Sequence, residues 1–166
     1  MKWARDYFAM ARHAALELQA IDARLSALAD ARNIKAQGYA NGRVSLSDVQ
    51  AASDAYLDFE MAADGLRAPH RAILDDATEL LYGPHARAGV AKLLGSKYAD
   101  VICWRWLQLR NWREIARDFG RTVRWCQLVQ AAAFDWLDDV GESHIRAYND
   151  GEQEFLDAMR GAGGEG

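Results

Sequence analysis

The chain has 166 residues, of which 51% are hydrophobic and 27% charged, and this globular composition excludes a wholly disordered protein. Two prolines and many good helix formers favour helices over an all-β fold. No uncharged stretch approaches the roughly 20 residues of a membrane span, and the first residues lack a signal-peptide pattern. We therefore expect a soluble, intracellular protein with no membrane partner and with reduced thiols at Cys103 and Cys126.

Charge is distributed unevenly along the chain, although its net value is only −4. Residues 97–130 carry seven basic and three acidic side chains, whereas residues 131–166 carry two basic and nine acidic ones. Six of the seven cations in the middle block are arginines, whose guanidinium groups suit phosphate and guanine recognition. A charge run by itself usually marks a solvated helix face, so its meaning depends on its place in the fold.

Residues 1–83 contain two heptad patterns, each of which predicts a long helix. In the first pattern, apolar or small residues follow one another at alternating steps of three and four from Ala4 to Leu28. Residues 33–47 interrupt the pattern with glycine and with the turn-forming pair Asn41-Gly42. We expect the chain to reverse its direction there.

The second heptad pattern begins after Ser47, which together with Gln50 predicts a capping box. The pattern runs to Leu80 and continues across Pro69, so we expect one kinked helix and not two. Folded back antiparallel, the two helices would form a coiled-coil arm, with heptads paired either within one chain or between copies. Within one chain, the expected layers pair Leu28 with Val49, Leu25 with Ala52, Ile21 with Tyr56 and Leu18 with Phe59.

From residue 84 to residue 140 the long repeats give way to short helical segments. Five of the six tryptophans lie within Trp104–Trp136. So dense an aromatic set allows a unit of about 55 residues to build a core without disulfides. We therefore expect an all-α protein, in which an antiparallel helical arm precedes a compact helical domain.

Inside this domain the sequence has the elements of a helix-turn-helix. Residues 112–119 predict a short helix that ends at Gly120, and Thr122 is a suitable N-cap for the next helix. Ala116 would let the two helices cross closely, and Cys126 would pack the second helix onto the first. The second helix then has its N-terminal side chains free to enter a major groove.

Three motifs in residues 111–137 match a known pattern: Trp112-x-x-Ile115-Ala116, Gly120-x-Thr122 and Ala133-Phe134-x-x-Leu137. With them this segment resembles sigma factor region 4, and more narrowly the small phage-encoded sigma-like regulators around the RinA and ArpU late-gene activators. Members often carry an N-terminal coiled coil, so the resemblance in architecture extends over residues 1–137. Arg121 and Cys126 depart from the family pattern, which has an apolar residue at the first position and valine or isoleucine at the second.

The resemblance implies a helix that begins at Thr122 and reads bases in the major groove. The family's base-facing positions fall on Thr122, Val123, Arg124, Gln127, Leu128 and Ala131. Arg124 and Gln127 have the chemistry to read guanine and adenine edges. The positions expected near DNA phosphates are Arg113, Arg117 and Arg121. The basic block thus centres on the candidate recognition helix, which favours DNA binding over a merely solvated face.

We interpret the chain as a sequence-specific, double-stranded DNA-binding transcriptional regulator of phage or prophage type. One alternative is a helix-turn-helix protein of phage packaging, similar to a small terminase subunit, although the DNA-binding unit usually comes first there. Another is an interaction module that acts on RNA polymerase. Phosphate-loop, nucleophile-elbow and zinc-protease motifs are absent and the four histidines are scattered, so we expect no enzyme activity, catalytic residue, cofactor or metal.

Residues 141–166 are acidic and end in a glycine-rich stretch with few apolar residues. This composition predicts a flexible tail. Two roles remain open for it. The tail could be a solubilising appendage, or a tethered polyanion that competes with DNA phosphates for the basic surface between Arg105 and Arg124.

Overall fold

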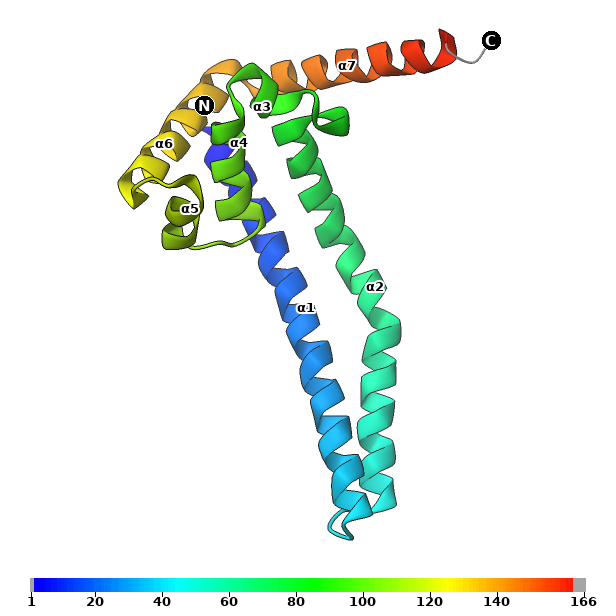
Figure 1. The fold of residues 1–166 in the computed structure, drawn as a ribbon. Coiled ribbons are helices and arrows are strands. Elements are labelled where there is room, and N and C mark those ends of the chain that lie inside the picture. Colours follow the sequence, from blue (N-terminus) through cyan, green and yellow to red (C-terminus); the bar gives the residue numbers. More distant parts are fainter. Residues whose placement is uncertain (1, 163–166) are drawn as a thin grey trace. The chain divides into compact units, whose positions relative to one another are not determined.

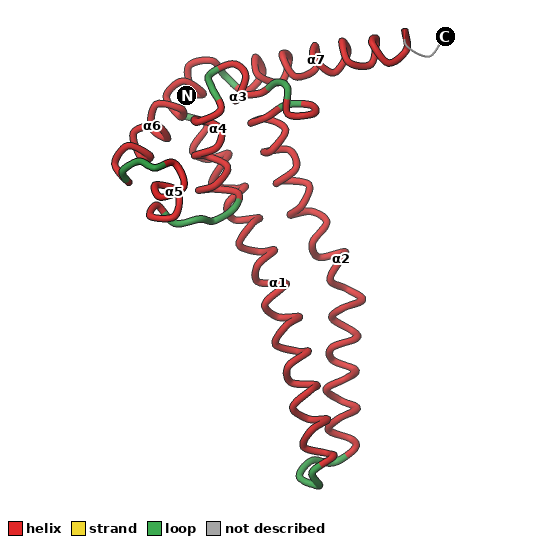
Figure 2. Tube along the Cα trace, viewed as in Figure 1, coloured by secondary structure: helices red, strands yellow, loops and turns green. Residues whose placement is uncertain are grey.

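The computed structural model describes residues 2–162, which contain helices and no strand, so the all-α expectation is confirmed (Figures 1 and 2). The chain divides into two compact units. The hairpin unit comprises residues 16–72, and the core unit combines residues 1–15 with residues 73–166. No helix in the described range is both long enough and apolar enough to cross a membrane.

Two long helices, α1 (Trp3–Ala40) and α2 (Leu46–Tyr82), account for the first half of the chain. The last part of α1, residues 16–40, and the first part of α2, residues 46–72, run antiparallel in the hairpin unit (Figure 1). Helix α2 continues through Pro69, as the uninterrupted heptad pattern predicted. A long helical hairpin is therefore present.

The turn between the two helices is shorter than the sequence suggested, because α1 continues to Ala40. Gly38 lies inside the helix and faces Val44, whose Cγ2 would be 2.4 Å from a Cβ added to the glycine. This glycine therefore makes room for packing and does not mark the reversal, which comes at Gly42 with φ 69°. The N-cap of α2 is Ser45 and not Ser47, since the Ser45 hydroxyl accepts the backbone N–H of Asp48 at 3.3 Å.

This longer α1 changes which residues face each other across the hairpin. Tyr56, expected opposite Ile21, instead lies under the guanidinium of Arg32, 4.1 Å from the ring centroid. Arg67 pairs with Asp22 at 2.6 Å. The expected layers, including Leu18 with Phe59, are therefore wrong. The turn at residues 41–45 contains the predicted turn-forming pair Asn41-Gly42, but it lies in the later part of the interval 33–47, and this shifts the register of the two helices.

The core unit contains the start of α1, the end of α2 and all of the shorter elements. These elements are η1 (Pro84–Ala86), α3 (Gly89–Leu93), α4 (Ser96–Ile102), the π-helical turn η2 (Cys103–Leu107), α5 (Trp112–Phe119), α6 (Val123–Val140) and α7 (Glu142–Ala162). The expected arm of residues 1–83 therefore does not form one domain, because both of its ends belong to this unit.

The start of α1 packs directly on α6. Phe8 is fully buried and stacks on Phe134 with ring centroids 5.9 Å apart. The indole of Trp3 donates to the backbone carbonyl of Leu137 at 3.0 Å. The regularly spaced apolar residues at the start of α1 therefore pack in the core. Their spacing alone had assigned them to the coiled-coil arm.

Residues 142–162 form helix α7, so the expectation of a flexible tail is wrong for this part of the chain. Ile145 is fully buried in the core, and Asn149 is 4% exposed. The guanidinium of Arg146 donates to both carboxylate oxygens of Asp76 at 2.9 Å. These anchoring residues are isolated in an acidic sequence, so the overall composition of the segment did not indicate that they pack against the core. The last part of the expected tail, residues 163–166, lies outside the described residues.

Candidate nucleic-acid interface

Helix α5 begins and ends with well-defined local signals. Asn111 accepts the backbone N–H of Glu114 at 3.0 Å, and the Glu114 carboxylate accepts the backbone N–H of Asn111 at 2.9 Å. This reciprocal pair is a capping box. The helix ends at Gly120, which has φ 61° and ψ 36°. The left-handed turn expected at this glycine is therefore present.

Helix α6 begins directly after that turn. The Thr122 hydroxyl accepts the backbone N–H of Trp125 at 3.1 Å, which confirms the predicted N-cap. Between the two helices, Ala116 and the fully buried Cys126 belong to one apolar cluster, together with Ile115 and Val129. The helix, glycine turn and capped helix thus have the packing that the sequence predicted for a helix-turn-helix.

The candidate base-reading positions lie along the first half of α6. Arg124, Gln127, Leu128 and Ala131 are exposed, and their spacing of three, four and seven residues places them on one helix face. Leu128 is 56% exposed. Val123 differs from the others, because it is half-buried and packs against the cluster around Cys126. Thr122 is exposed, and its hydroxyl already caps the helix.

The candidate phosphate-binding arginines are also at the surface. Arg113 is exposed, and within the described residues it has no ion-pair partner. Arg117 keeps 75% of its side chain exposed, with its Nε 3.4 Å from Asp118. Arg121 is exposed and lies over the Trp125 ring, 5.5 Å from its centroid. All three side chains can therefore reach a ligand outside the fold.

Two other arginines of the basic block have structural roles, which the sequence did not show. Arg105 lies 5.0 Å from the centroid of Trp112, and burial lowers the pKa of its guanidinium. Arg110 forms an ion pair with Asp118 and lies 4.7 Å from the ring centroid of Trp104. The hydrogen bond from Arg110 lowers the pKa of the Asp118 carboxyl. Two arginines of residues 97–130 are therefore held by contacts within the fold. Fewer arginines are available to a ligand than the sequence suggested.

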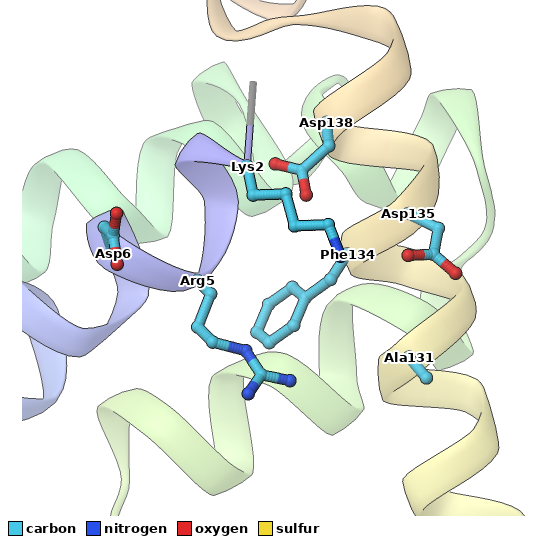
Figure 3. A pocket seen from close by; sticks show the side chains of 7 residues that line it. All are labelled: Lys2, Arg5, Asp6, Ala131, Phe134, Asp135 and Asp138. Atoms are coloured by element: carbon cyan, nitrogen blue, oxygen red, sulfur yellow. The ribbon is translucent and has the colours of Figure 1, made fainter.

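A hollow beside the candidate interface brings the start of α1 next to α6. Figure 3 shows Lys2, Arg5 and Asp6 on one side, and Ala131, Phe134, Asp135 and Asp138 on the other. The hollow thus combines two cations at the start of the chain, Lys2 and Arg5, with the carboxylates of Asp6, Asp135 and Asp138. Sequence reasoning missed this arrangement, since the two segments are far apart along the chain. Asp135 and Asp138 mark the point on α6 where positive charge gives way to negative charge.

The charges of α6 are arranged against its own helix dipole. A helix is stabilised by acidic residues at its N-terminus and basic residues at its C-terminus. Helix α6 instead has Arg124 in its first turn, whereas Asp138 and Asp139 lie near its end. Helix α5 follows the stabilising rule, with Glu114 in its first turn and Arg117 in its last. The charge pattern of α6 therefore does not serve the stability of that helix.

The chain matches no family model, no curated protein and no solved structure in the three comparisons made. In the part of the chain that the structure describes, no three His, Cys, Asp or Glu side chains are grouped so that they could hold a metal ion. What characterises the site is its exposed α6 row and the arginines beside that row.

Proposed function

We propose that this chain is a sequence-specific double-stranded DNA-binding protein that reads the major groove with helix α6 from Thr122 onward. We further propose that it regulates transcription in the manner of phage or prophage regulators, in the bacterial or phage-host cytoplasm. The observation that carries the proposal is the exposed row Arg124, Gln127, Leu128 and Ala131 on the first half of α6. The sigma-like motifs of residues 111–137 support the regulatory part of the proposal.

The dimensions of this row suit a major groove. A helix with its side chains is about 10–12 Å wide and the groove of B-DNA is about 12 Å wide, so one helix fits. From Arg124 to Ala131 the helix rises about 10 Å, the length of about three base pairs. The row could therefore contact three or four consecutive base pairs.

Each side chain of the row has a plausible partner on DNA. Arg124 can donate two hydrogen bonds to guanine, and Gln127 can pair with the adenine edge. Leu128 and Ala131 offer apolar contact to thymine methyl groups.

The flanking arginines would position the protein on the duplex. Arg113 and Arg117 lie on α5, and Arg121 lies in the turn between the helices. Contacts from these side chains to phosphates carry no sequence information but fix orientation and supply affinity. The charges of α6 also fit this arrangement, because Arg124 would face the DNA while the acidic second half of the helix would lie outside the groove.

The test is selection of binding sites from a random-sequence duplex library, followed by fluorescence anisotropy with the selected duplex and a scrambled one. We expect enrichment of a short motif and a preference for it that Arg124→Ala and Gln127→Ala reduce. Arg71→Ala, which removes an exposed arginine of the hairpin unit, is the matched control and should bind as wild type does. The absence of both enrichment and low-salt binding would refute the proposal.

A second candidate function is contact with a protein such as RNA polymerase, favoured by exposed apolar residues on α7. Phe155 is 58% exposed and Met159 is 62% exposed, one turn apart on an acidic helix. Such a helix face is suited to docking in a groove of another protein. Biolayer interferometry with purified bacterial RNA polymerase would test it, and binding that Phe155→Ala weakens while DNA selection fails would favour this function.

A further inference from the structure

The hairpin tip, residues 31–47, is basic and contains no acidic residue. It includes the end of α1, the turn and the start of α2 (Figure 1). Its cations are Arg32, Lys35 and Arg43. The rest of the hairpin unit, residues 16–30 and 48–72, instead carries eight acidic and three basic side chains. Positive and negative charge are therefore separated within one unit.

The cations of the hairpin tip are not needed to hold its structure. The turn is closed by the backbone, since the N–H of Arg43 donates to the carbonyl of Gly38 at 2.8 Å. Within the described residues, the side chains of Lys35 and Arg43 take part in no hydrogen bond or ion pair. Arg32 and Lys35 also precede the last turn of α1, where a cation would stabilise the helix dipole. Local stability therefore does not account for this positive charge.

The end of α1 presents two of these cations in one row. Arg32, Lys35 and Tyr39 follow one another at spacings of three and four residues, which places them on the same helix face. The Arg32 guanidinium lies over the Tyr56 ring, 4.1 Å from its centroid. This stacking uses one face of the guanidinium and leaves its N–H edge available. The row is about 10 Å long and ends at the turn, where Arg43 adds a third cation.

We propose that the hairpin tip binds the phosphate backbone of duplex DNA. The acidic remainder of the hairpin unit repels a polyanion, so the contact is confined to the tip. Neutral side chains that can donate to phosphate oxygens are also exposed there, namely Asn33, Gln37 and Asn41. Such a contact does not depend on α6, so it goes beyond the function proposed above.

Two other polyanionic ligands fit the hairpin tip less well. A membrane surface requires one apolar face that inserts between lipids. Ile34 is 67% exposed and Tyr39 is 49% exposed, but five residues of helix place them about 140° apart. Single-stranded nucleic acid is held by several aromatic side chains that stack on successive bases, and Tyr39 is the only aromatic residue of the tip. A duplex also carries twice the charge of one strand per unit length, which favours a compact group of cations.

Fluorescence anisotropy of the full chain with a scrambled duplex tests the contact. The tip variant, Lys35→Ala with Arg43→Ala, should bind about tenfold more weakly at about 0.05 M salt. It should also reduce the slope of log affinity against log salt by about two, because two phosphate contacts are lost. The control variant, Arg24→Ala with Arg71→Ala, removes two exposed arginines from the acidic part of the unit. It makes the same change in net charge and should stay within about twofold of wild type.

The same titrations separate this contact from base reading by α6. The tip variant should keep the wild-type preference for a selected duplex over a scrambled one, because phosphate contacts carry no sequence information. If no motif can be selected, base reading by α6 fails, but the loss caused by the tip variant remains measurable on scrambled DNA. Wild-type affinity and salt slope in the tip variant, or equal losses in the two double variants, would overturn the tip contact and leave the result for Arg124→Ala unaffected.

Two further ligands test the choice of duplex DNA. A single strand of the same sequence should bind the wild-type chain more weakly than the duplex does, and vesicles of phosphatidylserine and phosphatidylcholine should show no binding that depends on the tip. Tighter binding to the single strand, or vesicle binding that the tip variant abolishes, would overturn the proposal. Failure of the wild-type chain to bind the scrambled duplex at about 0.05 M salt would do the same. Circular dichroism confirms that each variant is folded.

Discussion

The side-chain amide of Asn149 joins α7 to two separate backbone segments. Its Oδ1 accepts the backbone N–H of Gly89 at 2.8 Å, and its Nδ2 donates to the carbonyl of Glu79 at 3.0 Å. Gly89 has φ 68°, and a Cβ there would lie 2.6 Å from the backbone of Leu81. The chain therefore passes too close to α2 for any other residue, and Asn149 satisfies the polar groups that this close approach leaves buried.

We expect Asn149→Ala to destabilise the core unit by about 1–3 kcal/mol, because it leaves the N–H of Gly89 buried without its partner. Urea denaturation followed by circular dichroism measures the change. Asn33→Ala, which changes an exposed asparagine of α1, is the control and should cost less than about 0.5 kcal/mol. Equal midpoints for the two variants would show that Asn149 does not secure α7.

A second prediction concerns the pH dependence of stability at Asp76. The Arg146 guanidinium holds the pKa of this carboxyl below its usual value, and the hydroxyl of Tyr7 also donates to it, at 2.5 Å. A carboxyl whose pKa is lowered by folding stabilises the native state above its unfolded pKa of about 3.9, and this stability is lost as pH falls through the folded value. Because the Asp76 side chain is 46% exposed, its contribution is limited to about 1 kcal/mol.

The test compares Asp76→Asn with wild type by urea denaturation at several pH values. The variant should be less stable by about 1 kcal/mol at pH values above about 5, and the difference should shrink as the pH falls below about 4. Asp150→Asn, which changes an exposed carboxylate on α7, is the control for the substitution itself. A difference between Asp76→Asn and wild type that stays constant with pH would mean that the ion pair with Arg146 is not its source.

The local signals of the helix-turn-helix could be predicted from the sequence, since each depends on residues that are close along the chain. Gly120 and Thr122 act through backbone conformation and a hydrogen bond to the next turn of helix. The exposure of Arg124 and Gln127 follows from the helical period once Cys126 is known to face the core. Interactions between residues that are close along the chain were therefore sufficient to predict this part of the candidate site.

Features that depend on distant residues could not be predicted in this way. A heptad pattern repeats identically along a helix, so it does not fix which turn of α1 faces which turn of α2. The register was set by Gly42 and Ser45 at the turn, whereas the pattern had suggested a cap at Ser47. Likewise, nothing in the local sequence indicated that Lys2 and Ala131 line the same hollow.

A third prediction separates base reading from phosphate contact. Arg124→Ala should cost about 1–3 kcal/mol on the selected duplex and relax its sequence preference, since a bidentate contact to guanine would be lost. Arg117→Ala should weaken selected and scrambled DNA about equally and reduce the slope of log affinity against log salt by about one. Anisotropy titrations at several salt concentrations give both quantities. If Arg124→Ala affects both duplexes alike, α6 is not the recognition helix.

The last prediction concerns the acidic C-terminal residues, which from the sequence alone could have competed with DNA for the basic surface. Helix α7 holds residues 142–162 in a regular structure, and its first half is anchored by Ile145 and Asn149. Figure 1 shows that α7 leads away from α5 and from the start of α6. The acidic side chains near its end are thus carried away from Arg113 and Arg124, and at moderate salt their field is screened within about 10 Å.

We therefore expect that removal of residues 151–166 changes the affinity for scrambled DNA by less than about twofold at 0.1 M salt. Stability should change little, because the buried contacts of α7 lie before residue 151. Anisotropy with the full-length and shortened chains measures the affinity, and urea denaturation checks the fold. Markedly tighter binding by the shortened chain, growing as salt is lowered, would instead show that the acidic end reaches the basic face and competes with phosphates.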